Sequence, residues 1–164
     1  GHVEALEVEF DPSVTNYETL ARLFFEIHDP TQVNRQGPDK GYQYRSAVFC
    51  QNEEQKNTIL RLIEELKAKG FAVATTVEPA HPFWPAEDYH QKYYSKKNGR
   101  PYCHAYQKRF VGSKSKRNPF LIEDFGRGSV VQGFSRPVVY LVDYSLYLFE
   151  SKFIKPCLFG EVLS

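Results

Sequence analysis

Residues 2–30, HVEALEVEFDPSVTNYETLARLFFEIHDP, carry two different hydrophobic periods in direct succession. Residues 2–10 alternate, with Leu6, Val8 and Phe10 on one side and Val3 and Ala5 on the other. A period of two is typical of a β-strand, and we expect the side with Leu6 to face the core. Asp11-Pro12-Ser13 ends this strand.

A helix is expected directly after that turn. Thr15 and Glu18 form a T-x-x-E capping box. The apolar residues behind it recur at helical spacing and are Tyr17, Leu20, Phe24 and Ile27. We expect this helix to stop near His28-Asp29-Pro30, because proline disfavours helical continuation.

The same order repeats in residues 45–77. Arg45 to Phe49 is expected to be a short strand, and Asn52 with Gln55 caps a second helix that Gly70 ends. Residues 71–77 alternate again as a strand, and residues 87–94 are expected to form a short helix. Strand, helix, strand, helix, strand predicts an α/β (α+β) fold, a two-layer sandwich in which two helices cover one sheet face.

Two regions are expected along the chain. Residues 1–110 form the patterned domain, and residues 111–164 form a tail whose pattern is unclear. A basic, polar segment at residues 112–117 marks the start of this tail. Within this tail, the apolar run Val138 to Phe149 is interpreted as one exposed-edge strand or an aggregation-prone segment. That run is too short for a membrane span and is interrupted by Asp143 and Ser145.

Composition narrows the class of protein only modestly. The chain has 21 Lys and Arg against 20 Asp and Glu in 164 residues, which gives no overall field that would argue for nucleic acid or an anionic membrane as a partner. Charge alone leaves the class of partner open, and we expect neither of these two. Three cysteines without paired spacing favour a reducing compartment, and we expect the cytoplasm. Cys103-His104 lacks a second ligand pair, so no metal site is expected.

Three features are candidates for a chemical role. Glu4 shares the core side with Leu6, where desolvation would raise its pKa and suit a proton donor; the alternative is a carboxyl at a frayed chain start. Residues 34–46 concentrate polar side chains around two glycines, which fits a polar pocket or an ordinary turn-rich connection. His90 would line the same cleft or have a structural role.

A set of motifs in fixed order gives these candidates a context. The set resembles the A-type peptide methionine sulfoxide reductases, and its members are Gly1-His2-Val3-Glu4, Asp11-Pro12, His28-Asp29-Pro30-Thr31-Gln32, Asn34-Arg35-Gln36-Gly37, Asp39, Gly41, Gln43-Tyr44-Arg45-Ser46-Ala47 and Pro85-Ala86-Glu87-Asp88-Tyr89-His90-Gln91. The resemblance implies a sandwich related to the ferredoxin-like plait, incomplete at its N-terminus. It also implies reduction of methionine S-sulfoxide in peptides and free methionine. We expect a monomer that uses no cofactor except an external thiol reductant, thioredoxin or dithiothreitol.

The resemblance also implies residue roles. Glu4 matches the acid that protonates the sulfoxide oxygen while a cysteine thiolate attacks sulfur, and Tyr44 matches a phenol that binds this oxygen. Asp39 matches a carboxylate that organises the substrate and a water, and His90 lies in the last family motif. Cys103 lies where some relatives keep a cysteine that resolves the sulfenic acid into a disulfide.

The sequence departs from the family at the nucleophile. The family's Gly-Cys-Phe-Trp segment and a second oxygen-binding tyrosine precede the His-x-Glu strand, and nothing precedes Gly1 in this sequence. Trp84 belongs to another motif and does not match the tryptophan of that segment. Cys50 lies six residues along from Tyr44, which is roughly 20 Å in a strand, so it is a poor candidate for the nucleophile. We expect the isolated chain to be inactive, with a non-catalytic module that binds sulfoxide peptides, or a non-functional fragment, as alternatives.

Overall fold

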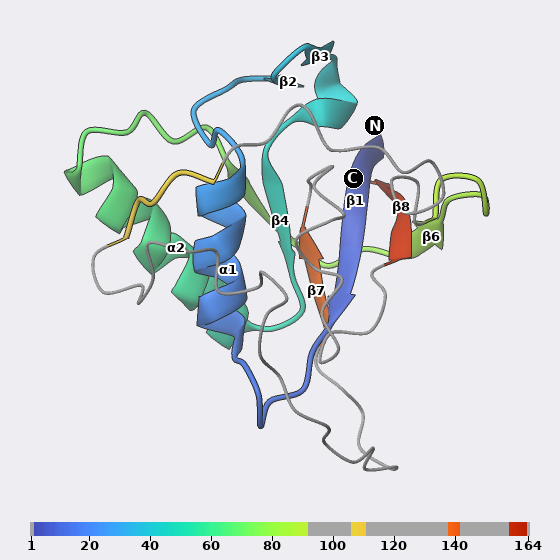
Figure 1. The fold of residues 1–164 in the computed structure, drawn as a ribbon, viewed down its shortest axis with the longest axis horizontal. Helices are drawn as coiled ribbons and strands as arrows, with labels where there is room; N and C mark the ends of the chain where they lie inside the picture. The colour runs from blue at the N-terminus through green and yellow to red at the C-terminus, as the bar shows by residue number, and fades with distance from the viewer. Residues whose placement is uncertain (1, 92–105, 111–137, 142–157, 164) are drawn as a thin grey trace.

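One six-stranded sheet organises the computed structural model, which describes residues 2–91, 106–110, 138–141 and 158–163. The order of strands in this sheet is β5-β4-β7-β1-β8-β6, and a separate β2-β3 hairpin lies at one end (Figure 1). The strands are β1 (His2–Glu9), β2 (Arg35–Gln36), β3 (Asp39–Lys40), β4 (Ala47–Cys50), β5 (Thr76–Pro79), β6 (Phe83–Pro85), β7 (Val138–Leu141) and β8 (Leu158–Leu163). The helices are α1 (Tyr17–Ile27), α2 (Glu53–Ala68) and the 3-10 turn η1 (Tyr42–Tyr44).

The expected α/β class is confirmed, and both helices lie on the same side of the sheet (Figure 1). Leu6, Val8 and Phe10 of the first strand region join residues of α1, α2 and β4 in the larger core cluster. The other sheet face is also buried in part, because Val3 and Ala5 pack with Ala47, Phe49 and Phe83. The alternating side chains of β1 therefore contribute to two apolar layers, one on each face of the sheet.

Several element boundaries differ from the predictions. The N-cap of α1 is Asn16, whose side chain accepts from the Thr19 backbone N–H at 2.9 Å, and not Thr15. Asparagine in the residue next to the helix is an equally strong cap. The cap of α2 at Asn52 is confirmed, with a 2.9 Å bond from the Gln55 N–H. Strand β5 begins only at Thr76, because the Ala74 N–H bonds to the Pro30 carbonyl at 2.8 Å instead of to a strand.

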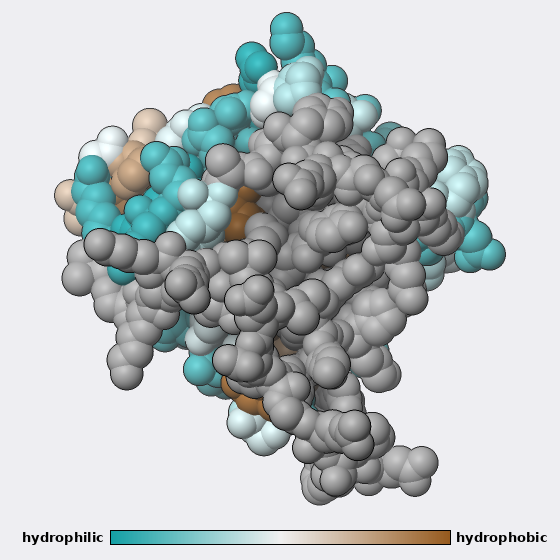
Figure 2. All heavy atoms as spheres, viewed as in Figure 1, coloured by the Kyte–Doolittle hydropathy of each residue, from teal (hydrophilic) through white to brown (hydrophobic). Residues whose placement is uncertain are grey.

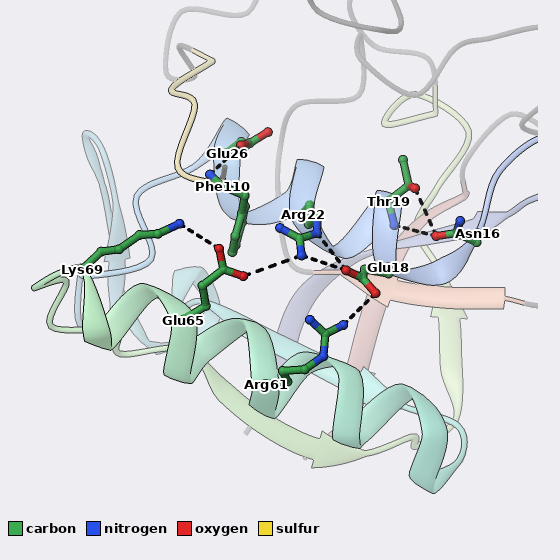
Figure 3. A network of polar contacts seen from close by, with 9 residues as sticks. All are labelled: Asn16, Glu18, Thr19, Arg22, Glu26, Arg61, Glu65, Lys69 and Phe110. Carbon is green, nitrogen blue, oxygen red and sulfur yellow. Dashed lines mark hydrogen bonds and ion pairs between the residues drawn. The ribbon is translucent and has the colours of Figure 1, made fainter. Parts of the chain in front are cut away.

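A chain of ion pairs links the two helices (Figure 3). Glu18 of α1 pairs with Arg22 at 2.8 Å and with Arg61 of α2 at 2.6 Å, and Arg22 lies 3.6 Å from Glu65. Such exposed pairs contribute little stability singly, about 0.5 kcal/mol each. Mainly hydrophilic residues cover the outer side of α2 and the β2-β3 hairpin (Figure 2). Within the described residues, no helix is long and apolar enough to span a bilayer.

Strand β7 corrects the expectation of an exposed-edge strand. Val138–Leu141 pairs with β1 on one side and with β4 on the other, so it lies inside the sheet. The remainder of the run, residues 142–149, lies outside the described residues. Strand β8, which the sequence pattern did not predict, pairs along β1 from His2 to Glu7. Segments on both sides of residue 110 thus build one sheet, and the expected division into two regions stays a prediction.

Residues 106–110 lie against α1 (Figures 1 and 3). The buried Glu26 carboxylate accepts hydrogen bonds from the backbone N–H of Arg109 at 3.0 Å and of Phe110 at 3.1 Å. The Tyr106 hydroxyl also donates to it, at 3.0 Å. Phe110 is 1% exposed and packs on Phe25 with a ring separation of 6.3 Å. This contact explains why α1 is buried on more sides than its apolar stripe predicts.

Candidate active site

Glu4 lies inside the paired part of β1. Its backbone is opposite Glu161 of β8, and its side chain is half-buried. The alternative of a frayed chain start is therefore wrong. The strand parity is as expected, because Leu6 and Val8 enter the core cluster of the helix side while Val3 and Ala5 enter the other. Glu4 thus belongs to the helix-side face of the sheet.

The polar loop expected at residues 34–46 forms a hairpin followed by η1, which contacts β1. A two-residue turn joins β2 to β3, and Gln36 pairs with Asp39 in register. The backbone requires a left-handed residue at Gly41, where φ is 146°, and its N–H bonds to the Asn34 carbonyl at 3.0 Å. This compact connection brings η1, which carries Tyr44, against β1, and Asp39 of β3 lies close enough to Tyr44 to raise the pKa of its phenol.

The pKa of the Tyr44 phenol depends on the nearby carboxylates of Glu4 and Asp39. Burial raises the pKa of the Tyr44 phenol first, and the negative charges of Glu4 and Asp39 raise the pKa further, although a hydrogen bond with Gln43 opposes them. A hydrogen bond between the Tyr44 hydroxyl and the Glu4 carboxyl also raises the pKa of the phenol. The phenol therefore keeps its proton at neutral pH and remains a hydrogen-bond donor.

Arg45 supports η1 from behind, a role that the sequence did not suggest. Its side chain is buried, its guanidinium lies 4.0 Å from the centroid of the Tyr42 ring, and its Nη2 pairs with Glu78 of β5 at 3.2 Å. A cation over an aromatic face and a partly buried carboxylate partner both hold this geometry. Arg45 thereby ties Tyr42 of η1 to β5.

The motif that begins at His28 has a structural role. Nδ1 of His28 donates to the Phe24 carbonyl at 2.6 Å, and Nε2 pairs with the Ser46 hydroxyl at 2.8 Å. Ser46 pairs in turn with Thr75 at 2.8 Å. This buried chain of polar groups joins the end of α1 to the start of β4, which bounds the polar loop.

Asp29 organises the first half of the loop. Burial alone would raise the pKa of its carboxyl, but hydrogen bonds from Thr31 and Gln32 hold the pKa below its usual range. Gln36 bonds to the backbone N–H and carbonyl of Asp29, each at 3.3 Å. A cavity of about 370 Å³ lies beside these groups and beside Arg109, and most of its polar lining is engaged in these mutual bonds.

Two further site residues were predicted, His90 and Cys103. His90 lies in a turn, where its ring contacts that of Tyr89 and its Nε2 lies 3.9 Å from Glu87, so its substrate role stays a prediction. The expected helix at residues 87–94 is a turn as far as Gln91, and the rest lies outside the described residues. Cys103 and Cys157 also lie outside them. No group of three metal-ligating side chains occurs in the described part of the chain.

Cys50 is buried in the core at the end of β4. Burial raises the pKa of its thiol, although an interaction with the Tyr17 hydroxyl opposes this. Because the thiolate is the attacking species, a buried thiol with a raised pKa is a poor nucleophile. Cys50 is therefore unsuited to the role of an attacking thiolate.

A family model described as peptide methionine sulfoxide reductase matches residues 1–120. Among similar proteins, a peptide methionine sulfoxide reductase MsrA of Nautilia profundicola is 50% identical over 103 residues, 63% of this chain and 60% of that protein. One of the same name from Deinococcus radiodurans is 49% identical over 108 residues, 64% of this chain and 52% of that protein.

A solved structure is also similar. The crystal structure of Mxr1 from Saccharomyces cerevisiae in reduced form superposes with a TM-score of 0.56 at 40% sequence identity. The match covers 59% of this chain and 55% of that one. The chain thus spans little more than half the length of these relatives.

Proposed function

The chain belongs to the peptide methionine sulfoxide reductase family, whose model matches residues 1–120, and we propose that it carries the half of the active site that binds the sulfoxide oxygen. The observation that carries this proposal is the contact of η1 with β1, which brings the Tyr44 phenol close enough to Glu4 and Asp39 for both carboxylates to raise its pKa, although Glu4 and Asp39 lie 35 positions apart in the sequence. The activity that the cluster serves is reduction of methionine S-sulfoxide in peptides and free methionine.

The chemistry needs proton donors at this place. A cysteine thiolate attacks the sulfoxide sulfur, the sulfur–oxygen bond breaks, and the electron pair leaves with oxygen. Protonated Glu4 gives its proton to that oxygen, the Tyr44 hydroxyl donates a hydrogen bond to it, and Asp39 helps to orient the substrate. Donors placed where charge develops lower the barrier. The hydroxide so released then attacks the cysteine sulfur, and the bond between the two sulfurs breaks with its electron pair going to the methionine sulfur. The products are methionine and a cysteine sulfenic acid.

The sulfenic acid must then be reduced. Cys103 is proposed to attack it, which forms a disulfide and releases water. Two electrons from an external thiol, thioredoxin in the cell or dithiothreitol in vitro, would restore both thiols. Cytoplasmic location, a monomeric state and the contribution of His90 to substrate binding belong to the same proposal.

Binding of sulfoxide is the experiment that tests the cluster. We expect Tyr44→Phe to weaken binding of N-acetyl-methionine S-sulfoxide methylamide about tenfold, because one hydrogen bond is worth about 1 to 1.5 kcal/mol. Glu4→Leu should act in the same direction. Titration calorimetry on the 164-residue chain measures both, with Tyr89→Phe, an exposed tyrosine outside the cluster, as the matched control. Equal affinity of Tyr44→Phe and the unsubstituted chain would refute the assignment.

Turnover is expected to be absent from the 164 residues by themselves. They contain no Gly-Cys-Phe-Trp segment, and Cys50 is buried. Incubation with an S-sulfoxide peptide and dithiothreitol, followed by chromatography, should yield no methionine peptide above a protein-free control. Turnover that disappears in Cys103→Ser would contradict this expectation and would make Cys103 the nucleophile.

A second function is a non-catalytic module that binds oxidised peptides. It rests on the same polar cluster of Glu4, Asp39 and Tyr44. Binding without turnover supports this function for the isolated chain, and absence of both supports a non-functional fragment.

A further inference from the structure

Trp84 lies in the same row of the sheet as Glu4. Strand β8 pairs with β1 on one side and β6 on the other, and its residue Glu161 is the partner of both Glu4 and Trp84. Next in register, Val162 is the partner of both Val3 and Phe83. Paired residues of an antiparallel sheet point to the same face.

The packing fixes which face this is. Val3 and Phe83 share the smaller core cluster, so their side chains point away from the helices. Because successive residues alternate, Glu4 and Trp84 both point to the helix-side face. The row therefore places an indole beside the polar cluster and on its side of the sheet.

Trp84 has surface to offer there. Its side chain is 59% exposed, and β6 ends the order of strands in the described sheet. Two strand spacings, about 10 Å, separate its backbone from that of Glu4. Tyr42, the exposed aromatic residue of η1, already has the Arg45 guanidinium over its ring. Trp84, in contrast, presents an exposed aromatic face that a ligand can cover.

We propose that Trp84 binds an apolar side chain two or three positions away from methionine sulfoxide in an oxidised peptide, so that the site prefers peptides with an apolar residue there. This inference rests on the proposed function of Glu4 and Tyr44. An extended peptide advances about 3.4 Å per residue, so a sulfoxide held at Glu4 places residues one to three positions away over β8 and β6. An indole face favours apolar and aromatic contacts.

Two matched peptides test the inference on the full 164-residue chain. They are acetyl-Leu-Leu-Gly-Met(S-oxide)-Gly-Leu-Leu-amide and the same peptide with glycine in place of every leucine. We expect the leucine peptide to bind about fivefold more tightly by calorimetry. It should also shift the emission of Trp84, which is the only tryptophan in the sequence, more than the glycine peptide does at saturation.

Variants assign the preference to Trp84. Trp84→Ala should bind the two peptides equally, whereas Trp84→Phe should keep most of the preference because it keeps an aromatic face. Leu60→Ala, a truncation at a 42% exposed residue of α2, is the control and should leave the preference unchanged. Circular dichroism checks that each variant is folded.

The outcomes distinguish a failure of the role proposed for Trp84 from a failure of the proposed function. Equal binding of both peptides by the unsubstituted chain, or a preference that survives in Trp84→Ala, overturns the role of Trp84 and leaves the polar cluster intact. Binding of neither peptide overturns the proposed function and the inference together.

Discussion

Phe110→Ala is expected to destabilise the protein by about 3 to 5 kcal/mol, the usual cost of removing a buried phenyl ring. The ring is 1% exposed and packs edge-on against Phe25. The Arg22 guanidinium lies 4.7 Å from its centroid and the Lys69 ammonium 5.2 Å, so the truncation also removes two cation contacts (Figure 3). Urea unfolding followed by circular dichroism measures the loss.

Leu60→Ala gives the comparison for this truncation. Leu60 is 42% exposed on α2, and its truncation should change the free energy of unfolding by less than about 1 kcal/mol. A Phe110→Ala loss as small as that of the control would show that residues 106–110 do not contribute to the core.

Glu26→Leu should cost about 3 to 5 kcal/mol, although leucine is the more apolar residue. The carboxylate is the shared acceptor for two consecutive backbone N–H groups and the Tyr106 hydroxyl. Leucine would leave these donors buried without an acceptor. Glu26→Gln keeps one acceptor oxygen in the same shape and should cost about half as much.

Hydrogen exchange adds a local measurement to the unfolding data. The Arg109 and Phe110 amides should lose protection in Glu26→Leu while amides of β4 keep theirs relative to global stability. Glu53→Gln, at a side chain that is 77% exposed, is the control. Unchanged protection of Arg109 and Phe110 would mean that Glu26 does not hold this segment.

Local sequence patterns predicted the elements that local physics determines. Alternation in residues 2–10 gave β1, helical spacing gave α1 and α2, and Asn52 with Gly70 marked the ends of α2 correctly. The cap of α1 was misplaced by one residue, because Thr15 and Asn16 are both good caps and only the fold selects between them.

Such local patterns could not predict contacts between residues that are distant in the sequence. β7 and β8 pair with β1 at sequence separations of 129 positions or more, and no residue of β1 signals its partner. Glu26 and Phe110 are 84 positions apart, and Phe25, an apolar residue off the helical stripe, was the one available hint. The approach of Tyr44 to Glu4 was expected only through the family resemblance, and the register that aligns Trp84 with Glu4 exists only in the sheet.

The most direct measurement is an isotope-filtered NMR experiment on the 164-residue chain with N-acetyl-methionine S-sulfoxide methylamide. If Glu4, Asp39 and Tyr44 form the site for the sulfoxide oxygen, the S-methyl protons should show contacts to the ring protons of Tyr44. The R epimer should show weaker contacts, and unoxidised methionine none. Methyl contacts confined to residues away from η1 and β1, or no saturable binding of the S epimer, would contradict the account.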